Sequence, residues 1–288
     1  MLISNTAIRR VLFLSGLVVF ATAVAISAAP QSELLDERWE RHDPRSDMRV
    51  DNSDWAWFLS EYLITDDPSG VHLIPYAEIS ERSRARLQRY ISELESVPVS
   101  RLNRDEQMAY WLNLYNAVTV ELILEHYPVE SIRDINISGP FFNRHPWDAE
   151  LVEVEGEELS LNNIEHNIIR PIWEDERIHY VVNCAAMDCP VLHYELFAGE
   201  NYDRLFDEAA RRYINSPSGF SHEDGRPVFS SIFDWYEGDF GNGIEDVVAH
   251  MLVYAEGETR RQLLAYRENG YSPRPRYEYD WALIDGSR

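Results

Sequence analysis

The segment from residue 103 to residue 128 constrains the fold most, because its pattern is that of one long helix. Asn103 can cap the start, and Glu106 three residues later completes an Asn-x-x-Glu variant of the capping box. Pro128 is expected to end the helix. The apolar side chains between them recur with helical spacing, at Met108, Trp111, Leu112, Tyr115, Val118 and Leu122.

Shorter elements follow the same reasoning. Residues 79–94, 161–169 and 202–214 have helical spacing; Ser160 can cap the second of these, and Pro171 is expected to stop it. Residues 151–154 and the apolar run 178–182 predict short strands, the second one buried. Scattered short strands among helices favour an α+β fold over regular βαβ units. We expect one mixed, helix-rich domain with a small sheet, and a cysteine-peptidase-like fold is one form it could take.

The basic residues exclude several chemistries. All 26 are arginines, since the sequence contains no lysine. The sequence also has 50 acidic residues, which gives a formal net charge of -24. Enzymes that need a Schiff-base lysine, a Walker-type lysine or a Ser-Lys pair are therefore excluded. The acidic surface would repel phosphate backbones, so no nucleic-acid partner is expected.

The first 29 residues predict an export signal or an uncleaved N-terminal anchor. Arg9 and Arg10 precede an uncharged apolar run at 11–26, and small residues follow. Cleavage could follow Ala25 or Ala29. We therefore expect an exported chain, periplasmic or secreted, that meets a membrane only through this segment. Residues 30–54 read as a polar, loosely held lead-in, and residues 55–288 as the globular domain.

Two amides interrupt the apolar pattern of the long helix. Asn113 and Asn116 are three residues apart and share a helix face. Amides among apolar residues are costly unless they are hydrogen-bonded. Either they tie down neighbouring backbone, or they line a pocket and bind a polar ligand, such as a small molecule or a peptide-like group.

A possible catalytic set lies downstream. Cys184 follows the predicted strand, where a nucleophile could reach a cleft, and His179 could deprotonate its thiol. On a regular strand these two side chains would point to opposite faces, and His166 would then be the better base. Glu165 could orient the base. The alternative is that Cys184 is a small buried residue, and that Glu165 and His166 lie on an exposed helix flank.

The second cysteine offers a further alternative. Cys184 and Cys189 are the only cysteines, so they form the only possible internal disulfide, and export compartments favour disulfides. Their spacing is neither a zinc signature nor the Cys-x-x-Cys of thiol–disulfide exchangers. No metal and no cofactor are expected.

These residues fall in blocks that resemble the DUF547 family, whose function is uncharacterised. The long helix reads MAYWLNLYNA at residues 108–117, and matching blocks continue to the Tyr279-Asp280-Trp281 segment, so that the resemblance spans roughly residues 95–285. It implies a fold but no activity. It also implies a cysteine at Cys184 and admits serine at Cys189, which favours a lone thiol over an essential disulfide. Both His166 and His179 match, so the base stays open.

Two functions follow from these observations. The first is a thiol hydrolase or acyl-transfer enzyme that uses Cys184, His179 or His166, and Glu165, with Asn113 or Asn116 holding the substrate. The second is a non-catalytic ligand-binding module of the cell envelope, in which the cysteines are structural.

Overall fold

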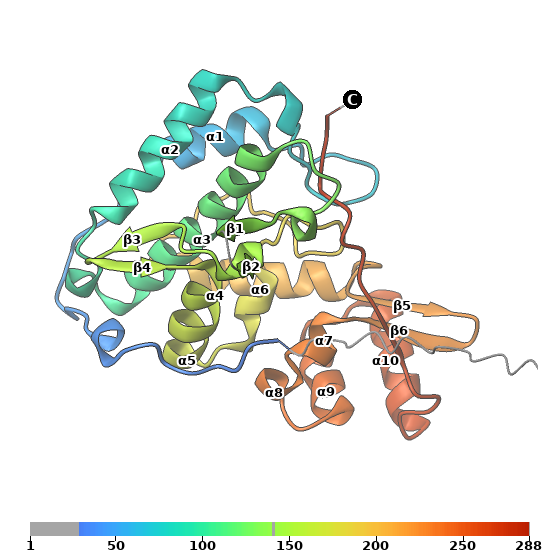
Figure 1. The fold of residues 1–288 in the computed structure, drawn as a ribbon. Helices are drawn as coiled ribbons and strands as arrows, with labels where there is room; N and C mark the ends of the chain where they lie inside the picture. Colours follow the sequence, from blue (N-terminus) through green and yellow to red (C-terminus); the bar gives the residue numbers. More distant parts are fainter. Residues whose placement is uncertain (1–28, 140–141, 288) are drawn as a thin grey trace, which may run out of the picture.

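Helix α3 (Arg104–His126) runs through the centre of the computed structural model, which describes residues 29–139 and 142–287 (Figure 1). Every residue from Glu106 to Val120 is buried, so other elements cover this helix on all sides. Asn103 caps it as predicted, because its side chain accepts a hydrogen bond from the Glu106 N–H at 2.9 Å. The capping box is wrong, since the Glu106 carboxylate accepts hydrogen bonds from the N–H groups of Val50 and Gly199 instead.

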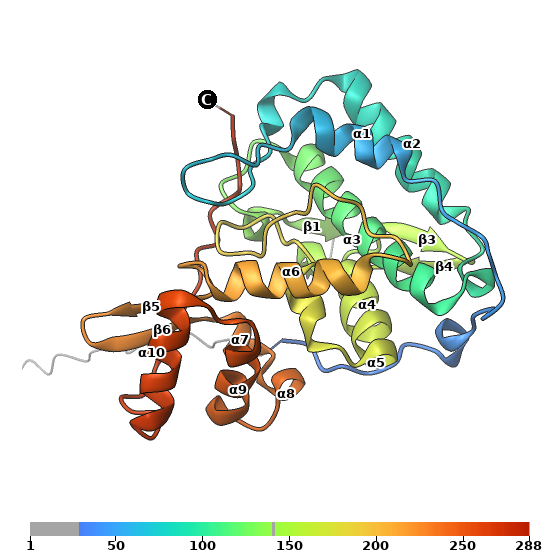
Figure 2. The same cartoon turned by 180° about the vertical axis from the view of Figure 1, so that it is seen from behind.

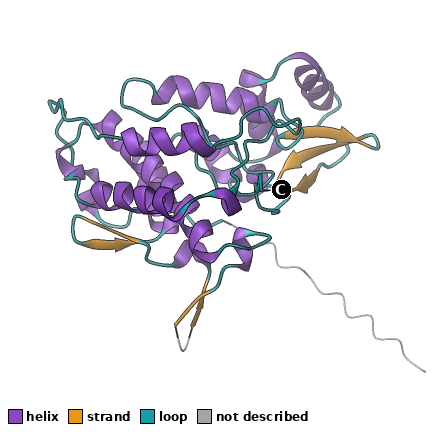
Figure 3. Ribbon diagram, turned by 90° about the horizontal axis from the view of Figure 1, so that it is seen from above, coloured by secondary structure: helices purple, strands orange, loops and turns teal. Residues whose placement is uncertain are grey.

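Helices dominate the fold (Figure 3), and several of them pack against α3. Helices α1 and α2 pack together on one side of it, and α6 lies on another, whereas α7 to α10 gather with a small sheet at the far end (Figures 1 and 2). Their bounds are α1 (Ser53–Tyr62), α2 (Glu81–Glu95), α4 (Leu161–Ile164), α5 (Arg170–Trp173), α6 (Tyr202–Ile214), α7 (Ile232–Trp235), α8 (Glu237–Phe240), α9 (Ile244–Tyr254) and α10 (Gly257–Glu268).

The strands of the described residues form three small sheets. Two are antiparallel hairpins, β1 (Ile137–Gly139) with β2 (Phe142–Arg144) and β3 (Val152–Val154) with β4 (Glu157–Leu159). In the third, β6 (Arg226–Ser230) pairs antiparallel with β5 (Phe220–Glu223) and parallel with β7 (Arg276–Glu278). The helix-rich α+β prediction is confirmed, with several small sheets in place of one.

The predicted buried strand at residues 178–182 is wrong. Residues Glu176–Tyr180 form a 3₁₀ helix, and the Asp175 side chain caps it by accepting a hydrogen bond from the Arg177 N–H. Ile178, Val181 and Val182 are buried, as a strand would also require. A short apolar run has no period that separates a buried strand from a buried turn of helix.

The helix that begins after Ser160 does not stop at Pro171. It widens into a π turn over Glu165–Ile169, where the Arg170 N–H bonds to the Glu165 carbonyl, and continues as α5. Pro171 is tolerated because it lies in the first turn of α5, where its missing N–H costs little. Pro171 has no N–H to donate to a carbonyl of the preceding turn, and the carbonyls of His166 and Asn167 in that turn accept hydrogen bonds from outside the helix.

Residues 30–35 donate those hydrogen bonds. The Glu33 N–H bonds to the His166 carbonyl at 3.2 Å, and the Leu35 N–H bonds to the Asn167 carbonyl at 2.9 Å. Two side chains bond back, from Arg170 to the Pro30 carbonyl and from Asn167 to the Glu33 carbonyl. This part of the lead-in is therefore held firmly against the helix rather than loosely, and it runs below α4 and α5 in Figure 2.

The proposed export signal lies almost wholly outside the described residues, which begin at residue 29. Among the described residues, no helix combines the length and the apolar character that a bilayer crossing requires.

Candidate functional site

The widened helix places Glu165 and His166 in the protein interior, with exposed fractions of 5% and 3%. The alternative of an exposed helix flank is therefore wrong. From α3, the Tyr115 hydroxyl donates a hydrogen bond to Oε2 of Glu165 at 2.9 Å. The carboxylate is thus fixed between two elements that lie far apart in the sequence.

His179 projects from the 3₁₀ helix and lies between two carboxylates. Its Nε2 is 2.7 Å from Oδ2 of Asp239 in α8, and its Nδ1 is 3.9 Å from Oε1 of Glu165. Nδ1 is buried and has no hydrogen-bond partner among the described residues. The ring stacks on Tyr236, with centroids 3.9 Å apart. This packing fixes the ring plane, so that Nδ1 stays directed towards Glu165.

Arg170 joins the two histidines. Its guanidinium donates two hydrogen bonds to Asp239, at 2.7 and 2.8 Å, and a third to Nδ1 of His166, at 3.0 Å. An arginine can only donate, so Nδ1 of His166 must accept. We call the connected side chains the carboxylate–histidine cluster: Tyr115, Glu165, His166, Arg170, His179, Tyr236 and Asp239.

The charges in the cluster follow from its contacts. Burial acts to raise the pKa of Asp239, but hydrogen bonds from His179 and Arg170 outweigh it and hold the pKa well below its usual range. Burial likewise opposes ionisation of Glu165, yet the histidines and the Tyr115 hydroxyl lower its pKa overall. Burial lowers the pKa of His166, and Arg170 adds to that effect. At neutral pH the two carboxyl groups are therefore ionised, and His166 is neutral.

Cys184 is half-buried and lies in a tight loop. Its sulfur is 3.0 Å from the Tyr279 hydroxyl and 2.8 Å from the sulfur of Cys189, and both cysteines are free thiols. Among the described residues, no hydrogen bond joins the Cys184 thiol to His166 or His179. The thiol therefore has a tyrosine and a second thiol as its immediate partners.

Cys184 interacts electrostatically with two tyrosines of the carboxylate–histidine cluster, Tyr115 and Tyr236. Burial raises the pKa of Tyr115 well above its usual range, and Glu165 and Cys184 nearby raise it further. Burial, Glu165 and Cys184 act on the pKa of Tyr236 in the same direction. The Tyr115 hydroxyl hydrogen-bonds to Glu165. Through these two rings, the thiol is electrostatically linked to the carboxylate that faces His179.

The amides of the long helix bind backbone. Asn113 donates to the Phe197 carbonyl at 2.8 Å. Asn116 donates to the Val181 carbonyl and accepts from the Asn183 N–H, and so holds the chain that leads into Cys184. Both residues are buried, so the structure gives these amides the tethering task that was one of the two alternatives. A substrate contact for either of them stays a prediction.

Sequence reasoning assigned no role to four residues that the structure places in or beside the site: Arg170, Tyr236, Asp239 and Tyr279. All four fall in blocks that carry the family resemblance. Each of these polar residues stands next to an apolar residue in the sequence, as in Arg170-Pro171 and Asp239-Phe240. This pattern is the sequence signal that could have indicated them as members of the site. Except for the Arg170–His166 pair, their contacts join residues 57 to 95 positions apart, so spacing could not reveal them.

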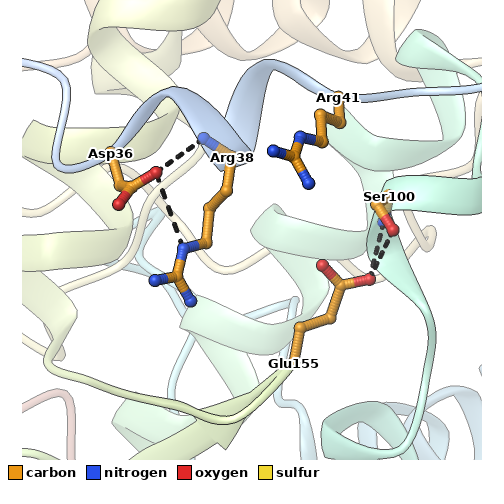
Figure 4. Close-up of a pocket in the computed structure, with 5 residues that line it drawn as sticks. All are labelled: Asp36, Arg38, Arg41, Ser100 and Glu155. Carbon is orange, nitrogen blue, oxygen red and sulfur yellow. Dashed lines mark hydrogen bonds and ion pairs between the residues drawn. The ribbon is translucent and has the colours of Figure 1, made fainter.

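Figure 4 shows a different, open pocket of about 380 Å³ near the lead-in. Arg38 bonds to Asp36, and Glu155 accepts two hydrogen bonds from Ser100, so much of the charge in this pocket is already paired. It contains no member of the carboxylate–histidine cluster. Its lining residues are Asp36, Arg38, Arg41, Ser100 and Glu155.

Within the described part of the chain, no group of three or more histidine, cysteine, aspartate or glutamate side chains is arranged to hold a metal ion.

Residues 99–214 match the model of a family described as "Protein of unknown function, DUF547". The match includes Glu165, His166, His179 and Cys184, but it is shorter than the resemblance read from the sequence, and Asp239 and Tyr279 lie beyond it. No curated protein matches the chain, and no solved structure matches it. A cysteine-peptidase-like fold therefore stays a prediction.

Proposed function

We propose that this chain, a member of the DUF547 family through residues 99–214, is an exported cysteine-dependent hydrolase or acyl-transfer enzyme. One observation carries the proposal: in a buried cluster a histidine stands between two carboxylates, and two tyrosines of that cluster, Tyr115 and Tyr236, lie within electrostatic range of the half-buried Cys184 thiol. A nucleophile, a base and a group that orients the base are the parts that thiol catalysis needs.

His179 suits the role of base better than His166. Nδ1 of His166 already accepts a hydrogen bond from Arg170, whereas Nδ1 of His179 has no partner among the described residues. Asp239 accepts at Nε2 of His179 and so directs the ring proton to that nitrogen, which leaves the Nδ1 lone pair free to take a proton. Glu165 would then stabilise the protonated ring.

In the proposed reaction the Cys184 sulfur attacks the carbonyl carbon of an acyl group and gives its proton to His179. The imidazolium returns this proton to the leaving group as the carbon–leaving-group bond breaks, and an acyl-enzyme forms. Water or another nucleophile then releases the acyl group. The thiol must turn from Tyr279 towards the cluster when substrate enters. Catalytic hydrogen bonds are often long or misaligned in enzymes without substrate.

The order of charge, apolar run and small residues in the first 29 positions supports the export part of the proposal. Mass spectrometry of the chain recovered from a periplasmic or secreted fraction tests it. A mature start after Ala25 or Ala29, or an intact chain held in the membrane, is the expected result. An intact chain found only in the cytoplasm contradicts export.

The catalytic part is tested by alkylation of the reduced full-length chain. We expect iodoacetamide to label Cys184 faster than a free model thiol at neutral pH, and the His179→Asn variant to lose this advantage. A panel of activated esters, thioesters and peptides then tests turnover, which Cys184→Ser should abolish. A Cys184 thiol no faster than the model thiol, together with no turnover, contradicts the enzyme and leaves the alternative of a ligand-binding module.

A further inference from the structure

The two cysteines form a pair whose members differ in exposure. Their sulfur atoms are in contact at 2.8 Å, although five positions separate them in the sequence. Cys189 is buried, with 4% of its surface exposed, whereas Cys184 is half-buried. A reagent in solution therefore meets Cys184 more readily than Cys189.

The loop between them is held in place by bonds that do not involve either thiol. Asn183 accepts from the Ala185 N–H and donates to the Pro190 carbonyl, and so braces both ends of the loop. Ala185 has a φ of 58°, which turns the chain sharply after Cys184. The N–H groups of Met187 and Asp188 bond to carbonyls of the C-terminal segment, at residues 282 and 280. The contact between the sulfurs is therefore built into the backbone of the loop.

We propose that Cys184 and Cys189 are a site of reversible oxidation, at which a small-molecule disulfide such as oxidised glutathione converts the two thiols into an internal disulfide. The Cys184 thiolate attacks one sulfur of the reagent, whose S–S bond breaks and releases one thiolate that takes up a proton. Cys189 then attacks the Cys184 sulfur, the bond from Cys184 to the reagent sulfur breaks, and the second reagent thiolate leaves with the proton of Cys189. Two protein thiols are oxidised, and one disulfide is reduced to two thiols.

Burial assigns the order of the two steps. Cys184 meets the reagent more readily, so it forms the mixed disulfide, and Cys189 already touches the sulfur that it must attack. Burial raises the pKa of the Cys189 thiol, and Cys184 beside it adds to that effect, so Cys189 stays protonated and inert until the mixed disulfide forms.

Oxidation would remove the nucleophile of the enzyme. This consequence rests on the proposed function, whereas the oxidation itself does not. A disulfide that closes such a short loop adds little chain-entropy stabilisation. The bond is therefore better suited to reversible control of the thiol than to stabilising the fold.

The test uses the reduced full-length chain in buffers that contain oxidised and reduced glutathione in different ratios. Samples are quenched with acid, alkylated and weighed by mass spectrometry. We expect the chain to lose two hydrogens, to retain no glutathione, and to regain both thiols when folded protein meets a reductant. Cys189→Ser should instead retain one glutathione on Cys184, and Cys184→Ser should stay unmodified because Cys189 is buried.

Three results would overturn the proposal: two free thiols in every buffer, a wild-type chain that stops at the mixed disulfide as Cys189→Ser does, or a bridge that resists reductant while the protein is folded. None of these masses depends on turnover. A switch without any hydrolase activity, and a hydrolase without the switch, are therefore distinguishable outcomes.

Discussion

A single oxygen of Asp239 serves both His179 and Arg170. Oδ2 lies 2.7 Å from Nε2 of His179 and accepts a hydrogen bond from Nε of Arg170 at the same distance. One carboxylate on α8 thereby connects the 3₁₀ helix that carries His179 to the helix that carries Glu165 and His166. This contact joins residues beyond the matched family segment to those within it.

Replacing Asp239 should therefore loosen the whole site. Asp239→Asn leaves the Arg170 guanidinium without its ion pair, and we expect a loss of on the order of 2 kcal/mol in the free energy of unfolding, measured with urea. Asp203→Asn is the control, because Asp203 also pairs with an arginine but is 75% exposed, and it should lose less than about 0.5 kcal/mol. Equal losses in the two variants would show that the Asp239 pair is an ordinary surface contact.

The Tyr279 hydroxyl should control the reactivity of Cys184. It lies 3.0 Å from the thiol and can donate to the thiolate that alkylation requires. A hydrogen bond to a charged group is worth roughly 1.5–3 kcal/mol, so Tyr279→Phe should slow iodoacetamide labelling of Cys184 by about tenfold or more. Tyr277→Phe, two positions earlier on β7, is the matched control and should label at the wild-type rate. Unchanged labelling in Tyr279→Phe would remove this role from the hydroxyl.

The lead-in should contribute to stability through one backbone donor. Leu35→Pro deletes the N–H that bonds to the Asn167 carbonyl, and we expect the free energy of unfolding to fall by about 1–3 kcal/mol. Leu35 is itself 40% exposed, so little packing is lost with its side chain. Ser32→Pro serves as the control, since Ser32 is exposed and its N–H makes none of these backbone bonds. Equal unfolding curves for the two proline variants would contradict the contribution of this bond.

His193 should make the protein sensitive to mild acid. Burial, with a smaller effect of His72, lowers the pKa of His193 to about 4, so the folded state favours the neutral ring. In the unfolded chain the His193 ring titrates near pH 6.5. The full free energy of unfolding is therefore present above about pH 6.5, and part of it is lost as the pH falls towards 4, because only the unfolded chain takes up the proton. Between pH 7 and pH 5 we expect His193→Phe, which keeps a ring next to Phe197, to lose about 2 kcal/mol less stability than the wild type.

The exposed His222 provides the comparison for that measurement. His222→Phe should keep the acid sensitivity of the wild type in thermal or urea unfolding at the two pH values. Parallel pH dependence in wild type and His193→Phe would mean that other groups govern this pH range.

The parts of the fold that the sequence predicted correctly depend on neighbouring residues. The cap at Asn103, the end of α3 before Pro128 and the short strand predicted at residues 151–154 are all determined within a few positions. The 3₁₀ helix at Glu176–Tyr180 was missed because its apolar run is buried on all sides and so has no diagnostic period. On a regular strand, His179 and Cys184 would point to opposite faces. That objection to His179 as the base no longer applies, because Glu176–Tyr180 form a 3₁₀ helix.

The site was predicted in part for the same reason. Glu165, His166 and His179 do come together, whereas the Cys184 thiol contacts Tyr279 and Cys189 and neither histidine, and the contacts that give each group its properties are not local. Asp239 reaches His179 across 60 positions and Tyr279 reaches Cys184 across 95. No periodic pattern encodes such pairs, because they arise only when the α7–α10 region folds against the rest of the chain.

The π turn at Glu165–Ile169 makes the length of this segment as important as its composition. A regular α-helix turns by about 100° for each residue, so removing one residue here would restore the ordinary ladder and swing everything after it around the helix axis by that angle. Arg170 would then lose its contact with Asp239. The carbonyls of His166 and Asn167 would no longer be placed to accept the hydrogen bonds from residues 33 and 35. Homologous chains could exchange many side chains in this stretch and keep the site, but a single deletion would dismantle it.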